Sequence, residues 1–151
     1  MLSRTSHYAL QALIHLAQHE VDWPIPGPQI AQETGVPAKY LSAILGALVR
    51  AGVLKASPGR NGGFRVARSP ARVSLLDVLT PFEADLFAPH PTCPFGNPVC
   101  GDKDPCAGHN GWKVVLDTYQ DFLKNTSVKD VASRQRTIQR KRKRKTARRR
   151  G

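Results

Sequence analysis

"IAQETGVPAKYLSAILGALVRAGVLKASPGRNGGFRVAR", residues 30–68, contains two helical patterns joined by a short turn and followed by a hairpin pattern. The first helix begins at Pro28 and ends at Gly35, and the second begins at Pro37 and ends at Gly52. Apolar residues recur along the second helix at the spacing of one buried face: Leu41, Ile44, Leu45 and Leu48. Two helices with so short a connection indicate a helix-turn-helix.

The hairpin pattern directly follows these two helices. Residues 53–56 and 64–67 are short β-prone runs, and the "SPGRNGG" between them holds the Asn-Gly pair typical of tight hairpin turns. A hairpin in this place is a wing. The sequence therefore predicts a mainly α fold with a small β-hairpin wing, built as a winged helix-turn-helix domain plus a long C-terminal dimerisation helix.

Three more helical patterns flank the central stretch. Residues 3–20 predict one buried stripe, made of Leu10, Leu13, Ile14 and Ala17. Ser74 caps a short helix that runs to Leu79. Residues 109–124 predict a helix with a wide apolar face: Trp112, Val115, Leu116, Tyr119, Phe122 and Leu123. A domain this small leaves that face little to pack on, so we expect a dimer interface there, with core packing inside one chain as the alternative.

Positive charge is concentrated at the C-terminal end. Residues 134–151 hold eleven of the 23 Lys and Arg and no acidic residue, whereas residues 1–133 hold 12 basic and 11 acidic residues. Ile138 is the one sizeable aliphatic residue of this tail, so the tail cannot bury an apolar face. We expect a disordered basic tail that adds non-specific nucleic-acid contacts, with a merely solubilising tail as the alternative.

The sequence also indicates where the protein acts. No stretch has the roughly 20 apolar residues that a membrane span needs. The beginning of the chain is amphipathic and lacks the basic head and apolar run of a signal peptide. We therefore expect no membrane partner and a cytoplasmic, nucleoid-associated protein whose thiols stay reduced.

The helix-turn-helix and the wing together favour binding to double-stranded DNA. The second helix of such a motif enters the major groove with its N-terminal residues against the bases. Arginine on a slim hairpin suits the minor groove, where the negative potential is strongest. The candidate DNA contacts are Lys39, Tyr40, Ser42, Arg60, Asn61 and Arg65. For any one of these residues alone, the alternative is that it is simply a solvated surface residue. Two copies of the motif usually bind DNA together, so we expect a homodimer on a pseudo-palindromic operator.

All three cysteines lie in one proline-rich loop that a histidine closes. Cys93, Cys100, Cys106 and His109 are separated by six, five and two residues. Structural zinc prefers closely spaced pairs, and only Cys106 with His109 is one. Three spread thiols suit an iron–sulfur cluster (2Fe-2S or 4Fe-4S), with zinc and incidental thiols as alternatives. The sequence contains no Cys-x-x-Cys pair, no nucleophile–base arrangement and no phosphate loop, which are features that would indicate an enzyme. We therefore predict that the protein is not an enzyme.

Several segments, in order, resemble one known family. "HYALQALIHLA", the stretch 30–68, "SLLDVL", the three-cysteine loop and "TSVKDVAS" are similar to the Rrf-two family (IscR, NsrR and RirA types) of winged-helix transcription regulators. The resemblance covers about residues 1–133. It implies a homodimer whose long C-terminal helices cross, and a cluster that tunes DNA affinity in response to iron–sulfur status, iron, nitric oxide or redox state.

The same resemblance suggests the cluster ligands. "CAGHNGW" looks like the IscR-type pattern, which carries the ligand role to Cys93, Cys100, Cys106 and His109. His7 is a rival fourth ligand, because some relatives supply a carboxylate from that place on the partner's first helix. The longer first gap, the "GRNGGF" wing and the basic tail depart from the family. The implied domains are 1–80 (DNA-binding), 81–108 (cluster loop), 109–133 (dimerisation) and 134–151 (basic tail).

Overall fold

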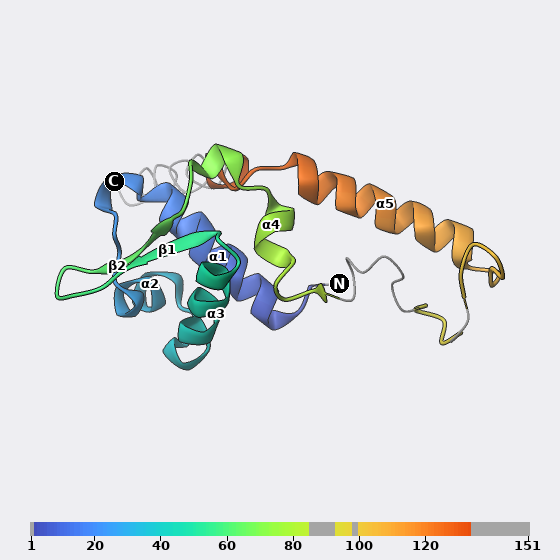
Figure 1. Cartoon of the computed structure of the whole chain (residues 1–151), viewed down its shortest axis with the longest axis horizontal. Coiled ribbons are helices and arrows are strands. Elements are labelled where there is room, and N and C mark those ends of the chain that lie inside the picture. Colours follow the sequence, from blue (N-terminus) through green and yellow to red (C-terminus); the bar gives the residue numbers. More distant parts are fainter. Residues whose placement is uncertain (1, 85–92, 98–99, 134–151) are drawn as a thin grey trace, which may run out of the picture.

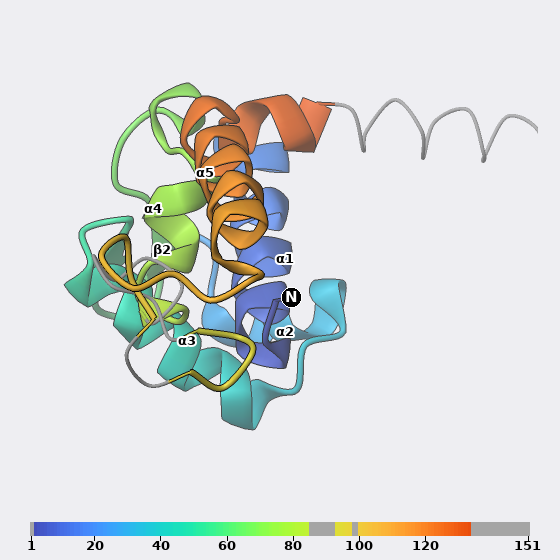
Figure 2. The ribbon, with the colours of Figure 1, turned by 90° about the vertical axis from the view of Figure 1, so that its right-hand side faces the viewer.

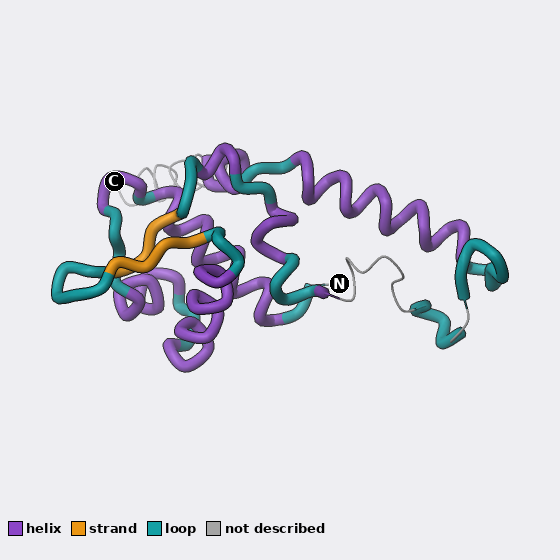
Figure 3. The backbone as a smooth tube through the Cα atoms, viewed as in Figure 1, coloured by secondary structure: helices purple, strands orange, loops and turns teal. Residues whose placement is uncertain are grey.

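The structure, a computed structural model, describes residues 2–84, 93–97 and 100–133 (Figure 1). The predicted basic tail, residues 134–151, lies outside the described residues. The α-helices are α1 (Arg4–Gln18), α2 (Gly27–Thr34), α3 (Ala38–Arg50), α4 (Leu75–Leu79) and α5 (His109–Asn125). The strands are β1 (Leu54–Ser57) and β2 (Gly63–Val66), and two 3-10 turns lie at Glu20–Asp22 and Pro70–Arg72 (Figure 3). The predicted fold class, mainly helical with one antiparallel hairpin, is confirmed.

The helix-turn-helix forms as the sequence predicts. Gly35 ends α2 in the left-handed conformation, with φ of 74°, and α3 starts after Pro37. The predicted core face of α3 is buried in full: Leu41, Ile44, Leu45 and Leu48. This face packs with α1, α2 and the hairpin into one hydrophobic core.

The prediction of which face of α1 is buried is wrong: the buried residues lie about one position earlier in the sequence than the predicted ones. The residues fully buried on α1 include Ala9, Ala12, Leu13 and Leu16, whereas Leu10, Ile14 and Ala17 are only half-buried. The prediction followed the bulkier side chains. The small alanines instead face inward and let α1 approach α3 and α4 closely.

His15 is also buried on this helix. Its burial and the neighbouring His19 lower the pKa of His15, against the raising effect of Glu33.

The wing is a short two-stranded hairpin in which Leu54 pairs with Val66 and Lys55 with Arg65. Its strands are shifted from the predicted ranges by one residue. A bridge between Ile25 and Phe64 fastens the hairpin to the loop before α2. A Cβ on Gly63 would lie 2.4 Å from the backbone of Ile25, so this close contact requires glycine.

The segment around α4 ties the end of the chain to the winged domain. Ser74 caps α4 as predicted, and Asp77 completes a capping box. Just before α4, the carbonyl of Val73 accepts a hydrogen bond from the amide of Val128, and the amide of Leu75 donates to Thr126. These bonds hold the residues after α5 beside α4.

Helix α5 projects from the winged domain, with its C-terminal end beside α4 and its first turn at the outer end (Figures 1 and 2). The predicted apolar face therefore divides. Leu116 and Leu123 are buried, whereas Val115 and Phe122 are 48% and 54% exposed, and Val114 outside the predicted face is 65% exposed. No helix in the described ranges is long and apolar enough to cross a membrane.

Candidate functional site

Two groups of candidate residues lie at opposite ends of the molecule, the wing at one end and the cysteine loop at the other (Figure 1). Lys39, Tyr40 and Ser42 are exposed at the N-terminal end of α3. The structure therefore places all three where a recognition helix presents side chains to a groove.

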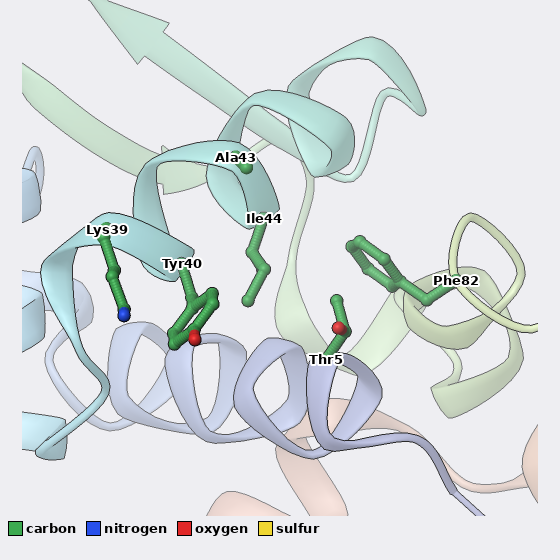
Figure 4. A pocket seen from close by; sticks show the side chains of 6 residues that line it. All are labelled: Thr5, Lys39, Tyr40, Ala43, Ile44 and Phe82. Atoms are coloured by element: carbon green, nitrogen blue, oxygen red, sulfur yellow. The ribbon is translucent and has the colours of Figure 1, made fainter.

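A shallow hollow borders this end of α3 (Figure 4). It is lined by Thr5, Lys39, Tyr40, Ala43, Ile44 and Phe82. The ring of Tyr40 stacks on Tyr8 of α1, with centroids 6.2 Å apart, and the Lys39 ammonium lies 4.7 Å from the Tyr40 centroid. This contact orients the Tyr40 ring against α1, while Tyr40, Lys39 and Ser42 all remain exposed at the start of α3.

The wing presents the three predicted residues and one more. Arg60 and Asn61 are exposed in the turn, and Arg65 is exposed on β2. Lys55, which the sequence reasoning missed, is exposed directly opposite Arg65. Two like charges in opposed positions of a hairpin destabilise it slightly, and a polyanion would relieve that repulsion. The register of the hairpin is the signal that identifies Lys55.

The cysteine loop folds back on itself so that its three sulfur atoms converge. The Sγ of Cys106 lies 3.4 Å from the Sγ of Cys100 and 3.9 Å from that of Cys93. The ligand atoms of the three cysteines all lie within 4.8 Å of one another, and each residue is half-buried. His109, the first residue of α5, places its Nδ1 3.3 Å from the Sγ of Cys100. Among the described residues this group does not include the rival His7, which is exposed on α1.

The thiols of the loop differ in acidity. Hydrogen bonds from the backbone amides of Asn97 and Phe95 lower the pKa of Cys93. The backbone of Cys106 lowers the pKa of Cys100, but desolvation and the sulfur atoms of Cys106 and Cys93 outweigh it, so this pKa is raised. The thiol of Cys93 is therefore more acidic than that of Cys100.

Two residues that the sequence reasoning missed hold His109 in place. Nε2 of His109 lies 3.0 Å from Asp102 Oδ1, and the Lys113 ammonium donates to both oxygens of Asp102 at 2.9 and 3.0 Å. The hydrogen bonds from Lys113 and then His109 lower the pKa of Asp102 to about 2. A charged Asp102 favours the tautomer with the proton on Nε2, which leaves the lone pair of Nδ1 facing Cys100. Metal-binding histidines have this arrangement.

The loop also makes one apolar contact with the start of α5. A Cβ on Gly108 would lie 2.4 Å from the ring of Phe95, so the ring rests directly on the Gly108 backbone. Phe95 itself remains 64% exposed. The loop is thus attached to α5 through Phe95 and the Asp102 hydrogen bonds.

The donor set fits a thiophilic metal centre. Three sulfurs and one imidazole nitrogen suit zinc or an iron–sulfur cluster. The buried indole N–H of Trp112, one turn after His109, has no acceptor within the described part of the chain. Two thiolates on one tetrahedral zinc are about 3.8 Å apart, which is close to the 3.9 Å between the sulfurs of Cys93 and Cys106 and more than the 3.4 Å between those of Cys100 and Cys106. A cluster with several irons needs sulfurs further apart, so the loop would open to hold one.

Comparison with known proteins identifies the family. A model of the Rrf2 family, described as an iron-dependent transcriptional regulator, matches residues 2–134. The chain belongs to the Rrf-two (Rrf2) family. An Aquifex aeolicus protein described as an HTH-type transcriptional regulator is 30% identical over 137 residues, which cover 87% of this chain and 90% of that protein. The regulator IscR of Xenorhabdus nematophila is 27% identical over 143 residues, with coverages of 89% and 85%.

Solved structures share the fold of this Rrf2 protein. The global cysteine regulator CymR of B. subtilis matches with a TM-score of 0.72 and 23% identity, over 88% of this chain and 96% of that one. The IscR of T. potens matches with a TM-score of 0.71 and 24% identity, over 88% and 86%. Rrf2 proteins are DNA-binding transcriptional regulators, which confirms the prediction that the protein is not an enzyme.

Proposed function

We propose that this Rrf2 regulator senses iron–sulfur status, iron, nitric oxide or redox state through an iron–sulfur cluster held by Cys93, Cys100, Cys106 and His109. The observation that carries the proposal is the convergence of the three cysteine sulfurs, one of which, that of Cys100, lies 3.3 Å from the imidazole of His109, which Asp102 orients. The IscR-named relatives support the choice of cluster. A fourth ligand from His7 of a second chain is the rival arrangement.

The residues of the loop prepare the site in different ways. Cys93, with its lowered pKa, offers the first thiolate. Asp102 and Lys113 hold the tautomer of His109, so that its Nδ1 can bind without rearrangement of the ring. When bound, the cluster would supply a redox-active and chemically labile centre. DNA affinity can then change only by the difference in free energy between the two states of the protein, and about 1–3 kcal/mol gives roughly 5–150-fold regulation.

In this proposal the protein binds a pseudo-palindromic operator as a homodimer. The exposed Val114, Val115 and Phe122 supply an apolar surface on α5 for the second chain. Lys39, Tyr40 and Ser42 would contact the major groove, and the wing would contact the minor groove. Residues 1–80 thus read DNA, 81–108 bind the cluster, and 109–133 join the two chains, while the basic tail, 134–151, adds non-specific contacts to phosphates.

Zinc is the second candidate occupant of the cysteine loop. The observation that favours it is the spacing of the sulfurs, 3.4 and 3.9 Å, which suits one tetrahedral ion without any opening of the loop. The protein would then be a zinc-stabilised nucleic-acid-binding protein without cluster sensing.

Anaerobic purification with iron and sulfide supplied separates the two candidates. The cluster proposal expects a coloured protein containing both elements, and it expects Cys100→Ala to remove the colour while the far-ultraviolet circular dichroism is unchanged. Asp104→Asn, an exposed carboxylate of the same loop, serves as the matched control and should stay coloured. A colourless protein with one zinc per chain contradicts the cluster and supports the second candidate.

A DNA titration tests the regulatory part of the proposal. The affinity for a defined palindrome, competed against bulk DNA, should differ between the cluster-loaded protein and the cluster-free protein by at least fivefold. Equal affinities for the two forms would contradict sensing even if a cluster is present.

A further inference from the structure

A second group of metal-ligand residues lies in the winged domain, away from the cysteine loop. His15 and His19 are one helical turn apart at the end of α1, and Glu33 lies on α2, the first helix of the helix-turn-helix. The ligand atoms of these three residues all lie within 4.8 Å of one another. We propose that His15, His19 and Glu33 form a binding site for a divalent transition-metal ion of the zinc type, which joins α1 to the helix-turn-helix.

The contact between His15 and Glu33 is the first support. Nε2 of His15 lies 3.1 Å from Glu33 Oε2. Despite this distance, Nε2 is buried and has no hydrogen-bond partner in the described part of the chain, because the carboxylate oxygen lies off the direction of the ring N–H. Two ligands on one tetrahedral ion, each about 2.0–2.2 Å from it, are separated by about 3.3–3.6 Å and meet at such an off-axis angle.

The other two ligands are oriented by their neighbours. Nδ1 of His19 lies 2.9 Å from the carbonyl oxygen of His15, to which it can donate, so the lone pair of this ring is then on Nε2. The side-chain amide of Gln29 donates to Glu33 Oε1 at 3.0 Å, which leaves Oε2 on the side of His15. Hydrogen bonds that fix the tautomer of a histidine and the rotamer of a carboxylate are the usual outer contacts of metal sites.

Burial and chemistry decide the class of ion. Two imidazoles and one carboxylate suit zinc and its first-row neighbours, whereas calcium and magnesium prefer oxygen ligands throughout. The side chain of His15 is 9% exposed and that of Glu33 is 42% exposed, so the group is closed on the core side and open to solvent on the other. An ion can enter from that side, with water as the fourth ligand.

A thiol-free full-length chain isolates this site from the cysteine loop. In the variant with Cys93, Cys100 and Cys106 all changed to Ser, zinc titration calorimetry should give one site per chain. Cobalt should give visible d–d absorption without thiolate charge-transfer bands. His19→Ala and Glu33→Gln in this background should each weaken zinc binding at least tenfold. These positions are partly exposed, so the variants avoid the folding defect expected of the buried His15.

Gln32→Ala, an exposed neighbour on α2, is the matched control and should bind zinc as the parent does. The proposal is overturned if the thiol-free chain binds no zinc stoichiometrically, or if Glu33→Gln and Gln32→Ala bind it equally well. Because the thiols are absent, this result is independent of the occupant of the cysteine loop.

Discussion

The winged domain and the outer end of α5 are held together by different forces. The core of the winged domain buries one continuous set of aliphatic side chains from α1, α2, α3, α4 and the hairpin. The outer end of α5 has instead a polar network around Asp102, a ring of Phe95 resting on Gly108, and the exposed Val114 and Val115. Hydrophobic burial stabilises the first region, whereas the second buries little apolar surface and is held mainly by polar contacts.

The largest effect should come from the core of the winged domain. Leu48, fully buried on α3, changed to Ala should lower the free energy of unfolding by about 2–5 kcal/mol, because the change leaves a cavity. Val114→Ala, on the exposed part of α5, should change the free energy of unfolding of a single chain by less than about 0.5 kcal/mol. Urea denaturation followed by circular dichroism measures both, and similar losses would erase the contrast between the two regions.

The next effect concerns the cysteine loop alone. Asp102→Asn removes the charge that holds His109 in its binding tautomer and should weaken metal binding by the loop about 10–100-fold. Competition with a zinc chelator measures the change in affinity. The urea midpoint of the winged domain should not move. An equal loss of affinity in Asp104→Asn would show that the charge of the loop matters and the orientation of His109 does not.

A smaller effect on the free energy of unfolding is expected at the start of α1, where Glu83 is hydrogen-bonded to this helix. The Glu83 carboxylate accepts hydrogen bonds from the Ser3 amide at 2.8 Å and from the Ser6 hydroxyl. Glu83→Gln keeps an acceptor oxygen but removes its charge, so it should cost about 0.5–1.5 kcal/mol at pH 7, because hydrogen bonds to a charged acceptor are stronger than those to a neutral one.

Acid titration separates this contribution from a general loss of packing. Burial raises the pKa of Glu83, but the hydrogen bonds from Ser6 and Ser3 prevail and lower it below its ordinary value. The stabilisation by Glu83 is therefore present above its ordinary pKa and is lost as the pH falls through its folded-state pKa. The stability difference between the wild type and Glu83→Gln should shrink in that acidic range. A difference that stays constant with pH would contradict a role for the charged carboxylate.

The smallest effect belongs to the wing. Lys55→Thr should stabilise the hairpin by about 0.2–1 kcal/mol, because it removes the like charge opposite Arg65 and adds a β-prone residue. The same change should weaken DNA binding on all sequences alike and flatten its salt dependence, since a lysine on a phosphate carries no sequence information. Thermal melting and salt titrations of DNA affinity measure the two effects, and a loss confined to one operator would contradict the phosphate role.

Local patterns were sufficient to predict most of the fold. The face of α3, the cap at Ser74 and the end of α2 at Gly35 depend on spacing within one element, and all three are confirmed. The buried face of α1 could not be found in the same way. It depends on how closely α3 and α4 approach, and a small residue such as Ala9 is decisive there for its size rather than its hydrophobicity.

The candidate sites were predictable only as far as the loop itself. The thiols and His109 stand out in the sequence by their clustering. Asp102 and Lys113 do not, because a salt bridge across eleven residues depends on how the loop folds back on α5. The group of His15, His19 and Glu33 was missed for the same reason, since the glutamate comes from another helix.

The fastening of α5 at one end has a mechanical consequence. Its C-terminal end is tied beside α4 by the backbone bonds of Thr126 and Val128, while its first residue, His109, carries the cysteine loop. The helix packs against the core as far out as Tyr119, so at about 1.5 Å per residue the ten residues beyond it form an arm of about 15 Å, and a tilt of about 10° displaces its end by about 3 Å. A small change of angle between α4 and α5 would therefore move the cysteine sulfurs by about the width of an atom, and a displacement of the sulfurs would in turn change the angle at which α5 meets the winged domain.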